Sequence, residues 1–259
     1  MNSTPKDHLH LETTLKPDLS LSSKNMSLSS VSMAMGHLAT SHGKKLGIYR
    51  GFDASRDCGW VVLSTKLRIL QSIPTDRPVK VETWVASIES GKLIREYRVS
   101  ENDRTLAEAA HAFVLFDRSS RRIVIPPREA RERLRGRNPT YRFNIDLSRR
   151  TERPIFSATD EIADRIVTIS DIDQNHHLNN SVYLRWMEAH IEQNGFTTDN
   201  SRQFRPFEFG IEFLAEVGVG EKVQLRSQKI DKNSELTTYF LPSDPARNLL
   251  AISRVALLS

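Results

Sequence analysis

The sequence predicts an α+β fold that is built twice, because a long helical pattern precedes a run of strand patterns in each half of the chain. Residues 29–46 and 179–193 carry apolar residues at helical spacing, and segments after each of them alternate in the manner of strands. A helix followed by an antiparallel meander is an α+β plan. A chain of 259 residues has room for two domains of ordinary size.

The first half begins with a short strand pattern at 9–15 and continues with the helix at 29–46. Val31 and Met35 keep the helical spacing, and Gly47 follows at the place of a helix-ending glycine. Four strand candidates come next, separated by turn signals: 59–70, 79–88, 93–99 and 107–117.

The second half repeats this order. A short strand is predicted at 164–170, and a helix follows at 179–193 with Asn179 or Asn180 as its N-cap. The strand candidates after the helix are 207–215, 222–230, 237–241 and 249–258. The repetition indicates a duplicated fold.

A weak echo at the level of residues supports the duplication. The segment 23–30 can be laid on the segment 173–180 at an offset of about 150, with leucines coinciding. In this alignment Ser23 replaces Asp173 and Ser27 replaces His177. The simplest interpretation is a first copy that has lost its chemical side chains.

These patterns predict four parts of the chain. Residues 1–8 form a flexible leader, and 9–118 form the first copy. Residues 119–155 form an Arg- and Pro-rich linker with one short polar helix, and 156–259 form the second copy. A solvated connector and a binding surface both explain the arginines of the linker.

Composition limits the classes of function. The chain is 38% hydrophobic and 27% charged, which is ordinary for a globular protein. Since no apolar run of about 20 residues and no secretory signal occur, we expect a cytoplasmic protein without a transmembrane segment. The net charge is +5, but no zinc-finger, helix-turn-helix or RNA-binding motif appears, so we expect no nucleic-acid partner.

Cys58 is the single cysteine, which excludes an intramolecular disulfide and a thiolate zinc cluster. We expect it to be a small packing residue. His176 and His177 are adjacent, so their side chains would diverge, and no further ligands follow at a suitable spacing. We therefore expect no metal and no other cofactor.

Asp173, Asn175 and His177 alternate just before the second predicted helix. In an extended segment residues two apart point the same way, so the three side chains could face one site. A carboxylate, an amide and an imidazole suit the activation of water, and helix N–H groups near Asn180 suit an oxyanion. A polar turn that caps the helix explains the same residue types, and both interpretations stay open at this point.

Glu216 is a second candidate. It closes the apolar stretch 207–215 and precedes a turn at Gly218 and Gly220. Acidic residues at strand ends are usually solvated, so residue type alone favours a surface position.

Two motifs resemble the signatures of plant and bacterial acyl-ACP thioesterases. The stretch 170–186, SDIDQNHHLNNSVYLRW, resembles their Asp-x-Asp-x-Asn-x-His-Val-Asn-Asn motif followed by Tyr and Trp. The stretch 212–218, EFLAEVG, resembles their Glu-Tyr-x-x-Glu-Cys-Gly segment. Residues 59–62 and 81–84 are similar to strands of the same family, so the resemblance runs from about residue 9 to the end.

The resemblance implies a tandem hotdog fold, with two long helices each wrapped by an antiparallel sheet. It implies that the first copy shapes an acyl tunnel and that the second copy holds the site. Asp173, Asn175, His177 and Glu216 match the catalytic set proposed for the family. Val217 stands where plant members have a cysteine, so hydrolysis here would need water or a carboxylate.

The implied activity is hydrolysis of fatty-acyl-[acyl carrier protein] thioesters, which releases a free fatty acid and ends chain elongation. Acyl carrier protein is small and acidic, so a basic surface would steer it. The alternatives are an acyl-CoA thioesterase of the same fold, which shares a shorter motif, a non-catalytic acyl-binding hotdog protein, and a hotdog dehydratase. A monomer and a homodimer are both open.

Overall fold

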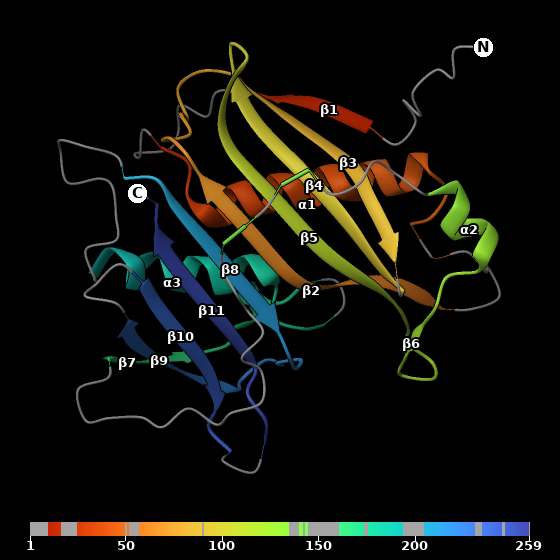
Figure 1. Cartoon of the computed structure of the whole chain (residues 1–259). Helices are drawn as coiled ribbons and strands as arrows, with labels where there is room; N and C mark the ends of the chain where they lie inside the picture. Colours follow the sequence, from red (N-terminus) through yellow and green to blue (C-terminus); the bar gives the residue numbers. More distant parts are fainter. Residues whose placement is uncertain are drawn as a thin grey trace. The chain divides into compact units, whose positions relative to one another are not determined.

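The computed structural model describes most of the chain and is drawn as a ribbon in Figure 1. The described residues are 10–16, 25–49, 51, 57–89, 91–134, 140–141, 143–144, 161–173, 176–193, 205–230, 235–244 and 247–258. The chain divides into two compact units. The first comprises residues 1–26, 31–65 and 72–142, and the second comprises 27–30, 66–71 and 143–259.

The first unit contains one long helix and an antiparallel meander, as predicted. Its elements are β1 (His10–Leu15), α1 (Leu28–Lys45), β2 (Cys58–Ile69), β3 (Val79–Glu89), β4 (Lys92–Glu101), β5 (Arg104–Asp117), β6 (Arg122–Val124) and α2 (Arg128–Arg133). Its strands lie in the order β1-β3-β4-β5-β2, and β6 pairs with β5. The short strand β6 was not predicted, whereas α2 is the short polar helix expected there.

Helix α1 begins and ends through local signals that the sequence carries. Ser27 caps its start, since its Oγ accepts the N–H of Ser30 at 3.0 Å. At its end Gly47 has a φ of +68°, and the N–H of Ile48 donates to the carbonyl of Gly43 at 3.0 Å. This is the bond of a Schellman motif, so the prediction of a helix-ending glycine is confirmed.

A buried apolar cluster marks the packing of the first unit. Its members come from the turn after α1, the strands β3 and β4, and the residue that follows α2: Ile48, Val85, Ile88, Leu93 and Leu134. Leu134 is 1% exposed, although it lies within the stretch predicted as a linker. Residues up to at least Leu134 therefore contribute to the core of this unit. Figure 1 shows α1 lying along one face of the strands β3 to β5.

The second unit repeats the plan. Its elements are β7 (Glu161–Ile166), a 3-10 turn (Ile169–Asp171), α3 (Asn180–Gln193), β8 (Phe207–Phe213), β9 (Lys222–Ile230), β10 (Glu235–Pro242) and β11 (Ala251–Leu257). The order β7-β9-β10-β11-β8 is the same permutation as β1-β3-β4-β5-β2. The tandem α+β hotdog prediction is thereby confirmed.

Helix α3 packs on its sheet through large side chains. The ring of Tyr183 lies 5.1 Å from that of Phe240 on β10, and Ser253 of β11 donates to the sulfur of Met187 at 3.3 Å. None of the helices in the described residues is long and apolar enough to cross a membrane.

Each unit has an equivalent backbone hydrogen bond just before its long helix. In the first unit the N–H of Met26 donates to the carbonyl of Ile73 at 2.7 Å. In the second unit the N–H of Leu178 donates to the carbonyl of Val217 at 2.8 Å. Each donor lies one residue before the N-cap of its helix, so the two bonds are structural counterparts.

This bond corrects the alignment of the two copies. It sets their offset at 152 around the helix start, in place of the predicted value of about 150. Asn25, and not Ser27, then occupies the position of His177, while Ser72 occupies the position of Glu216. The alignment by residue type was therefore two residues out of register, and the N-caps of the two helices give the correct register.

Candidate active site

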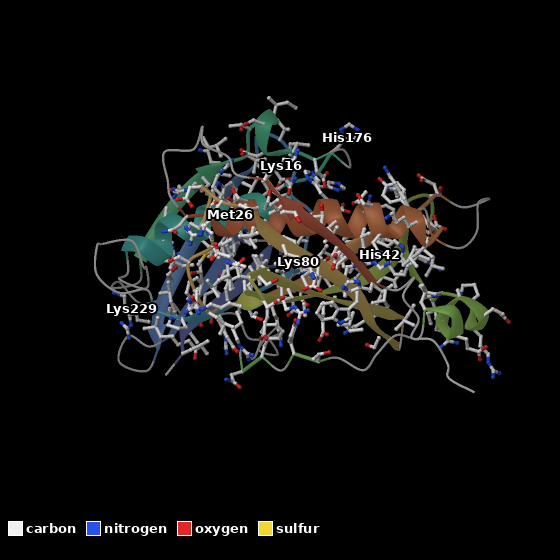
Figure 2. All side chains as sticks on the ribbon, turned by 90° about the horizontal axis from the view of Figure 1, so that it is seen from above. Lys16, Met26, His42, Lys80, His176 and Lys229 are labelled. Atoms are coloured by element: carbon white, nitrogen blue, oxygen red, sulfur yellow. The ribbon has the colours of Figure 1, made fainter. Side chains whose placement is uncertain are left out.

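The predicted site lies on a tight hairpin that enters α3. Ile172 and Leu178 form an antiparallel bridge, and the N–H of Asp173 donates to the carbonyl of His177 at 2.9 Å. The chain reverses at His176, which has a φ of +64° and is exposed; it is labelled in Figure 2. The expectation of an extended segment over 173–177 is therefore wrong. Residues that lie opposite each other in a hairpin have side chains on the same face. The side chains of Asp173 and His177 therefore share a face because of the hairpin, and not because the segment is extended.

Asp171 anchors the base of this hairpin. Its carboxylate accepts the N–H of Thr168 at 2.9 Å, the hydroxyl of Thr168 at 2.7 Å, and a guanidinium N–H of Arg185 from α3. Its carbonyl accepts the N–H of Asn179 at 2.9 Å. Burial alone would raise the pKa of Asp171, but the hydrogen bonds from Thr168 and Arg185 outweigh it and leave the pKa below its usual range.

The start of α3 is capped by Asn179, one of the two predicted residues. Its Oδ1 accepts the N–H of Ser181 at 2.9 Å and the hydroxyl of Ser181 at 2.8 Å. Asn180 is then the first residue of the helix, where N–H groups have no acceptor within the helix itself. The predicted oxyanion position therefore directly follows the hairpin.

Glu216 meets His177 from the segment after β8. Oε2 of Glu216 lies 3.3 Å from Nε2 of His177, and the two side chains are 45% and 39% exposed. Two contacts fix the backbone at this point: the bond from Leu178 to Val217, and a bond of 3.1 Å from the guanidinium of Arg247 to the carbonyl of Glu216. The acid and the imidazole thus face each other at the surface of the second unit.

The structure brings His177 and Glu216 together and places Asp173 opposite His177 in the hairpin, whereas Asn175 lies outside the described residues. Sequence reasoning missed Asp171 and the two arginines that hold the site. Asp171 carried a signal, because it is the first acid of the Asp-x-Asp motif. Arg185 lies inside the same motif, but only the fold brings it to Asp171, and Arg247 carried no signal because its partners Glu216 and Glu221 lie far from it in the chain.

The two single-residue expectations about nucleophiles concern Val217 and Cys58. Val217 is 1% exposed and packs in the core of the second unit, so the position supplies no nucleophile. Cys58 is buried at the start of β2, as expected for a packing residue.

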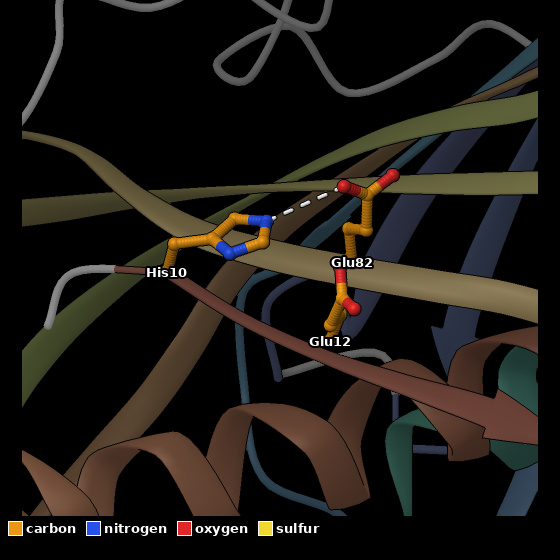
Figure 3. Close-up of side chains that lie close together, drawn as sticks. All are labelled: His10, Glu12 and Glu82. Atoms are coloured by element: carbon orange, nitrogen blue, oxygen red, sulfur yellow. Dashed lines mark ion pairs between the residues drawn. The ribbon is translucent and has the colours of Figure 1, made fainter. Parts of the chain in front are cut away.

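One group of side chains in the first unit has the composition of a metal site. Ligand atoms of His10, Glu12 and Glu82 lie within 4.8 Å of one another. Figure 3 shows the three side chains side by side. Lys80 lies 2.9 Å from Glu12, however, and Arg98 lies 2.8 Å from Glu82. Because these cations already neutralise the carboxylates, we interpret the group as an ion-pair network at the edge of the sheet.

Comparison with known proteins matches both halves of the chain to one family. Residues 18–134 match the acyl-ACP thioesterase N-terminal domain, and residues 157–245 match the acyl-ACP thioesterase C-terminal domain.

Curated relatives carry related names. The chain is 27% identical over 176 residues to a palmitoyl-acyl carrier protein thioesterase of Arabidopsis thaliana, covering 61% of this chain and 42% of that protein. It is 23% identical over 194 residues to a dodecanoyl-[acyl-carrier-protein] hydrolase of Umbellularia californica, covering 70% and 50%. The matches thus span half or less of the length of these relatives.

Solved structures support the fold. An acyl-ACP thioesterase from Bacteroides thetaiotaomicron aligns with a TM-score of 0.77 at 13% identity, covering 98% of this chain and 100% of that one. The 12:0-ACP thioesterase from Umbellularia californica aligns with a TM-score of 0.77 at 18% identity, covering 96% and 97%. With both domain models matched in order along the same fold, the chain belongs to the acyl-ACP thioesterase family.

Proposed function

We propose that this protein hydrolyses fatty-acyl-[acyl carrier protein] thioesters and releases a free fatty acid. The observation that carries the proposal is the pair of His177 and Glu216, 3.3 Å apart beside the start of α3. An imidazole and a carboxylate in contact can share the work of a general base. Family membership and the names of the curated relatives support the acyl carrier protein as the substrate carrier.

The proposed reaction uses water as the nucleophile. A water molecule beside His177 and Glu216 loses a proton to this pair as its oxygen attacks the thioester carbonyl. Helix N–H groups at Asn180 stabilise the oxyanion that forms. When the carbon–sulfur bond breaks, the pair returns the proton to the departing carrier thiol, and the acid is left free.

Two further roles complete the proposal. Asp173 lies across the hairpin from His177, where it orients the imidazole. In the alternative route, its carboxylate attacks the thioester carbonyl and expels the carrier thiolate, and water then hydrolyses the resulting anhydride to the free acid. Asn175 is predicted to hold the attacking water. The buried Val217 offers no sulfur, so no acyl-cysteine intermediate forms at that position.

The partner proposal concerns charge. The chain carries a net charge of +5, and an acidic carrier protein would be steered to it at low ionic strength. Turnover on acyl-ACP should therefore slow as salt rises from about 20 to 150 mM, through kcat/KM more than through kcat. A cytoplasmic location stays a prediction, and so does an oligomeric state of either a monomer or a homodimer.

A matched panel of substrates tests the function. Purified protein is given dodecanoyl and palmitoyl groups, each on acyl carrier protein and on CoA, and the release of free acid is measured. Faster release from the carrier protein is expected. Preference for CoA would favour the acyl-CoA thioesterase alternative, and tight acyl binding without release would favour a non-catalytic acyl-binding protein.

A further inference from the structure

A buried polar cluster lies inside the first unit, between α1 and its sheet. Arg95 of β4 is 3% exposed, and its Nη1 donates to Nδ1 of His42 on α1 at 2.7 Å and to the hydroxyl of Thr83 on β3 at 3.3 Å. His42 is labelled in Figure 2. Because arginine can only donate, Nδ1 of His42 must accept, so this imidazole does not carry a proton there.

His111 of β5 extends the cluster. It lies directly opposite Arg95 in the sheet, so their side chains share a face. Its Nδ1 is 3.1 Å from the hydroxyl of Tyr97, while its Nε2 is buried and has no hydrogen-bond partner among the described residues. Burial and then the charge of Arg95 lower the pKa of His111 to about 3, so the ring is neutral at physiological pH.

Among the residues that the structure describes, the cluster therefore holds one positive charge and no negative one. The ion pairs of the described residues give Arg95 no carboxylate. Arg68, by contrast, lies at the end of β2 in the stretch 66–71 that belongs to the second unit, and it has the buried Glu208 at 2.6 Å. Removing a guanidinium from water without a counter-charge is costly, and burial accordingly lowers the pKa of Arg95. Nε2 of His111 has no hydrogen-bond partner and Arg95 has no counter-ion among the described residues. An anionic oxygen bound between them would satisfy both groups.

The fold itself does not require this cluster. On the interior face of the second unit, the neighbouring positions of β9, β10 and β11 carry Ser227, Thr238 and Ser253. Ser227 and Thr238 satisfy each other at 2.6 Å, and Ser253 contacts the sulfur of Met187 on α3. The same architecture is thus built with small neutral hydroxyls.

We propose that Arg95 and His111 form a binding site for a carboxylate on an otherwise apolar ligand, with Thr83 holding the guanidinium in place. The guanidinium supplies the charge, and Nε2 of His111 supplies a second N–H when its proton sits there. Val85 lies opposite Arg95 on β3 and is buried, so the cluster has an apolar neighbour. This part of the proposal rests on the proposed function: the ligand is an acyl chain whose far end carries an acid group.

Calorimetric binding separates the distal acid from the rest of the ligand. Monomethyl suberate and methyl octanoate have the same ester end and eight-carbon chain, but only the first ends in a carboxylate. The wild-type protein is expected to bind monomethyl suberate at least tenfold more tightly, and Arg95→Met should abolish this difference. Arg98→Met is the matched control, since Arg98 lies on the same strand, pairs with Glu82 on the other face, and should leave the difference intact.

Octanoate distinguishes the source of the carboxylate. Weak binding of octanoate that does not depend on Arg95 assigns the site to the far end of an acyl group. Binding as tight as that of monomethyl suberate, lost in Arg95→Met, also supports the carboxylate site and assigns it to free acids. Equal affinity of the wild type for both esters, or an unchanged difference in Arg95→Met, would overturn the proposal.

Thermal unfolding of the ligand-free protein provides the second readout. If Arg95 serves a ligand, Arg95→Met should unfold at the same temperature as the wild type or higher, because an unpaired buried charge is gone. A clear fall in the unfolding temperature would show that Arg95 stabilises the fold instead, and it would count against the proposal. Should Arg95→Met fail to fold, Arg95→Lys keeps the charge and must still weaken the preference for monomethyl suberate. Calorimetry needs no turnover, so a failure of hydrolysis and a failure of this site are separate results.

Discussion

At the entrance to α1 the amide of Met26 donates to Ile73, and at the entrance to α3 the amide of Leu178 donates to Val217. The residue before each donor and the residue before each acceptor therefore occupy corresponding positions in the two units. These residues are an asparagine and a serine in the first unit, but a histidine and a glutamate in the second. The comparison teaches that both units have the same backbone bond before their long helix, but that only the second carries an imidazole and a carboxylate at these positions.

The interiors differ in the opposite sense. The second unit fills its sheet face with small hydroxyls that satisfy one another, such as Ser227 and Thr238. The first unit buries the guanidinium of Arg95 beside two neutral imidazoles. The two copies thus differ in where they place ionisable side chains: the second at its surface, at His177 and Glu216, and the first in its interior, at Arg95.

The largest effect is expected from exchanging side chains between the copies. His177→Asn gives the second unit the residue of the first, and we expect kcat to fall about 10²- to 10⁴-fold, since the general base is lost. The reverse change, Asn25→His, leaves the second unit intact and should alter kcat by less than twofold. Release of free acid from acyl-ACP is the measurement, and equal losses in the two variants would break the comparison.

The next largest effect concerns the anchor of the hairpin. Asp171→Asn should lower the free energy of unfolding by about 1–3 kcal/mol at pH 7, because a buried, charge-assisted network is weakened. The pKa of Asp171 is depressed in the folded protein, so its stabilisation is present above the ordinary carboxyl pKa and is lost as pH falls through the folded value. Urea unfolding of the wild type and of Asp171→Asn should therefore show a smaller difference in the free energy of unfolding at pH 3 than at pH 7. A difference that does not depend on pH would contradict this role.

Glu188 of α3 should show the opposite dependence on pH. It accepts the N–H of Leu28 and the hydroxyl of Ser29, but burial outweighs these bonds and raises its pKa. An acid with a raised folded pKa favours the folded state below the ordinary pKa, and this contribution disappears as pH rises through the folded value. Glu188→Gln keeps an acceptor, so relative to the wild type it should gain stability from pH 4 to pH 8. Glu188→Leu lacks the acceptor and should be less stable at both.

The smallest effects test α1 as a scaffold. Gly47 has a positive φ, so Gly47→Ala should cost about 1 kcal/mol although nothing lies within 4 Å of the added carbon. Gly36 lies within the helix with equally open space, so Gly36→Ala should stabilise by about 0.5–1 kcal/mol. Chemical unfolding measures both changes. The prediction fails if the two substitutions shift stability in the same direction.

Local signals explain why much of the fold could be predicted. The periodicity of Val31 and Met35 and the glycine at position 47 gave α1 within a residue at each end. Alternation gave the main strands, and their repetition gave the tandem plan. The three-residue β6 was missed because its pairing with β5, and not its own sequence, makes it a strand.

The site was predictable in its residues but not in its geometry. Asp173 and His177 were recognised by a motif. The chain reversal at His176, however, depends on backbone hydrogen bonds that the periodicity of the sequence does not predict. The contact of His177 with Glu216 spans 39 positions of the chain and follows from strand order. The Arg95 cluster was invisible for the same reason, since its members come from one helix and three strands.

The most direct test of the central claim compares Glu216→Gln with Ser72→Ala, its counterpart in the first unit. Both variants and the wild type are given dodecanoyl-ACP at pH 7, and free dodecanoate is measured under single-turnover conditions. We expect Glu216→Gln to lose at least 100-fold in rate, in line with the loss of about 10²- to 10⁴-fold typical for a general base, while Ser72→Ala matches the wild type. Near-normal turnover by Glu216→Gln would contradict the assignment of the chemistry to the His177–Glu216 pair.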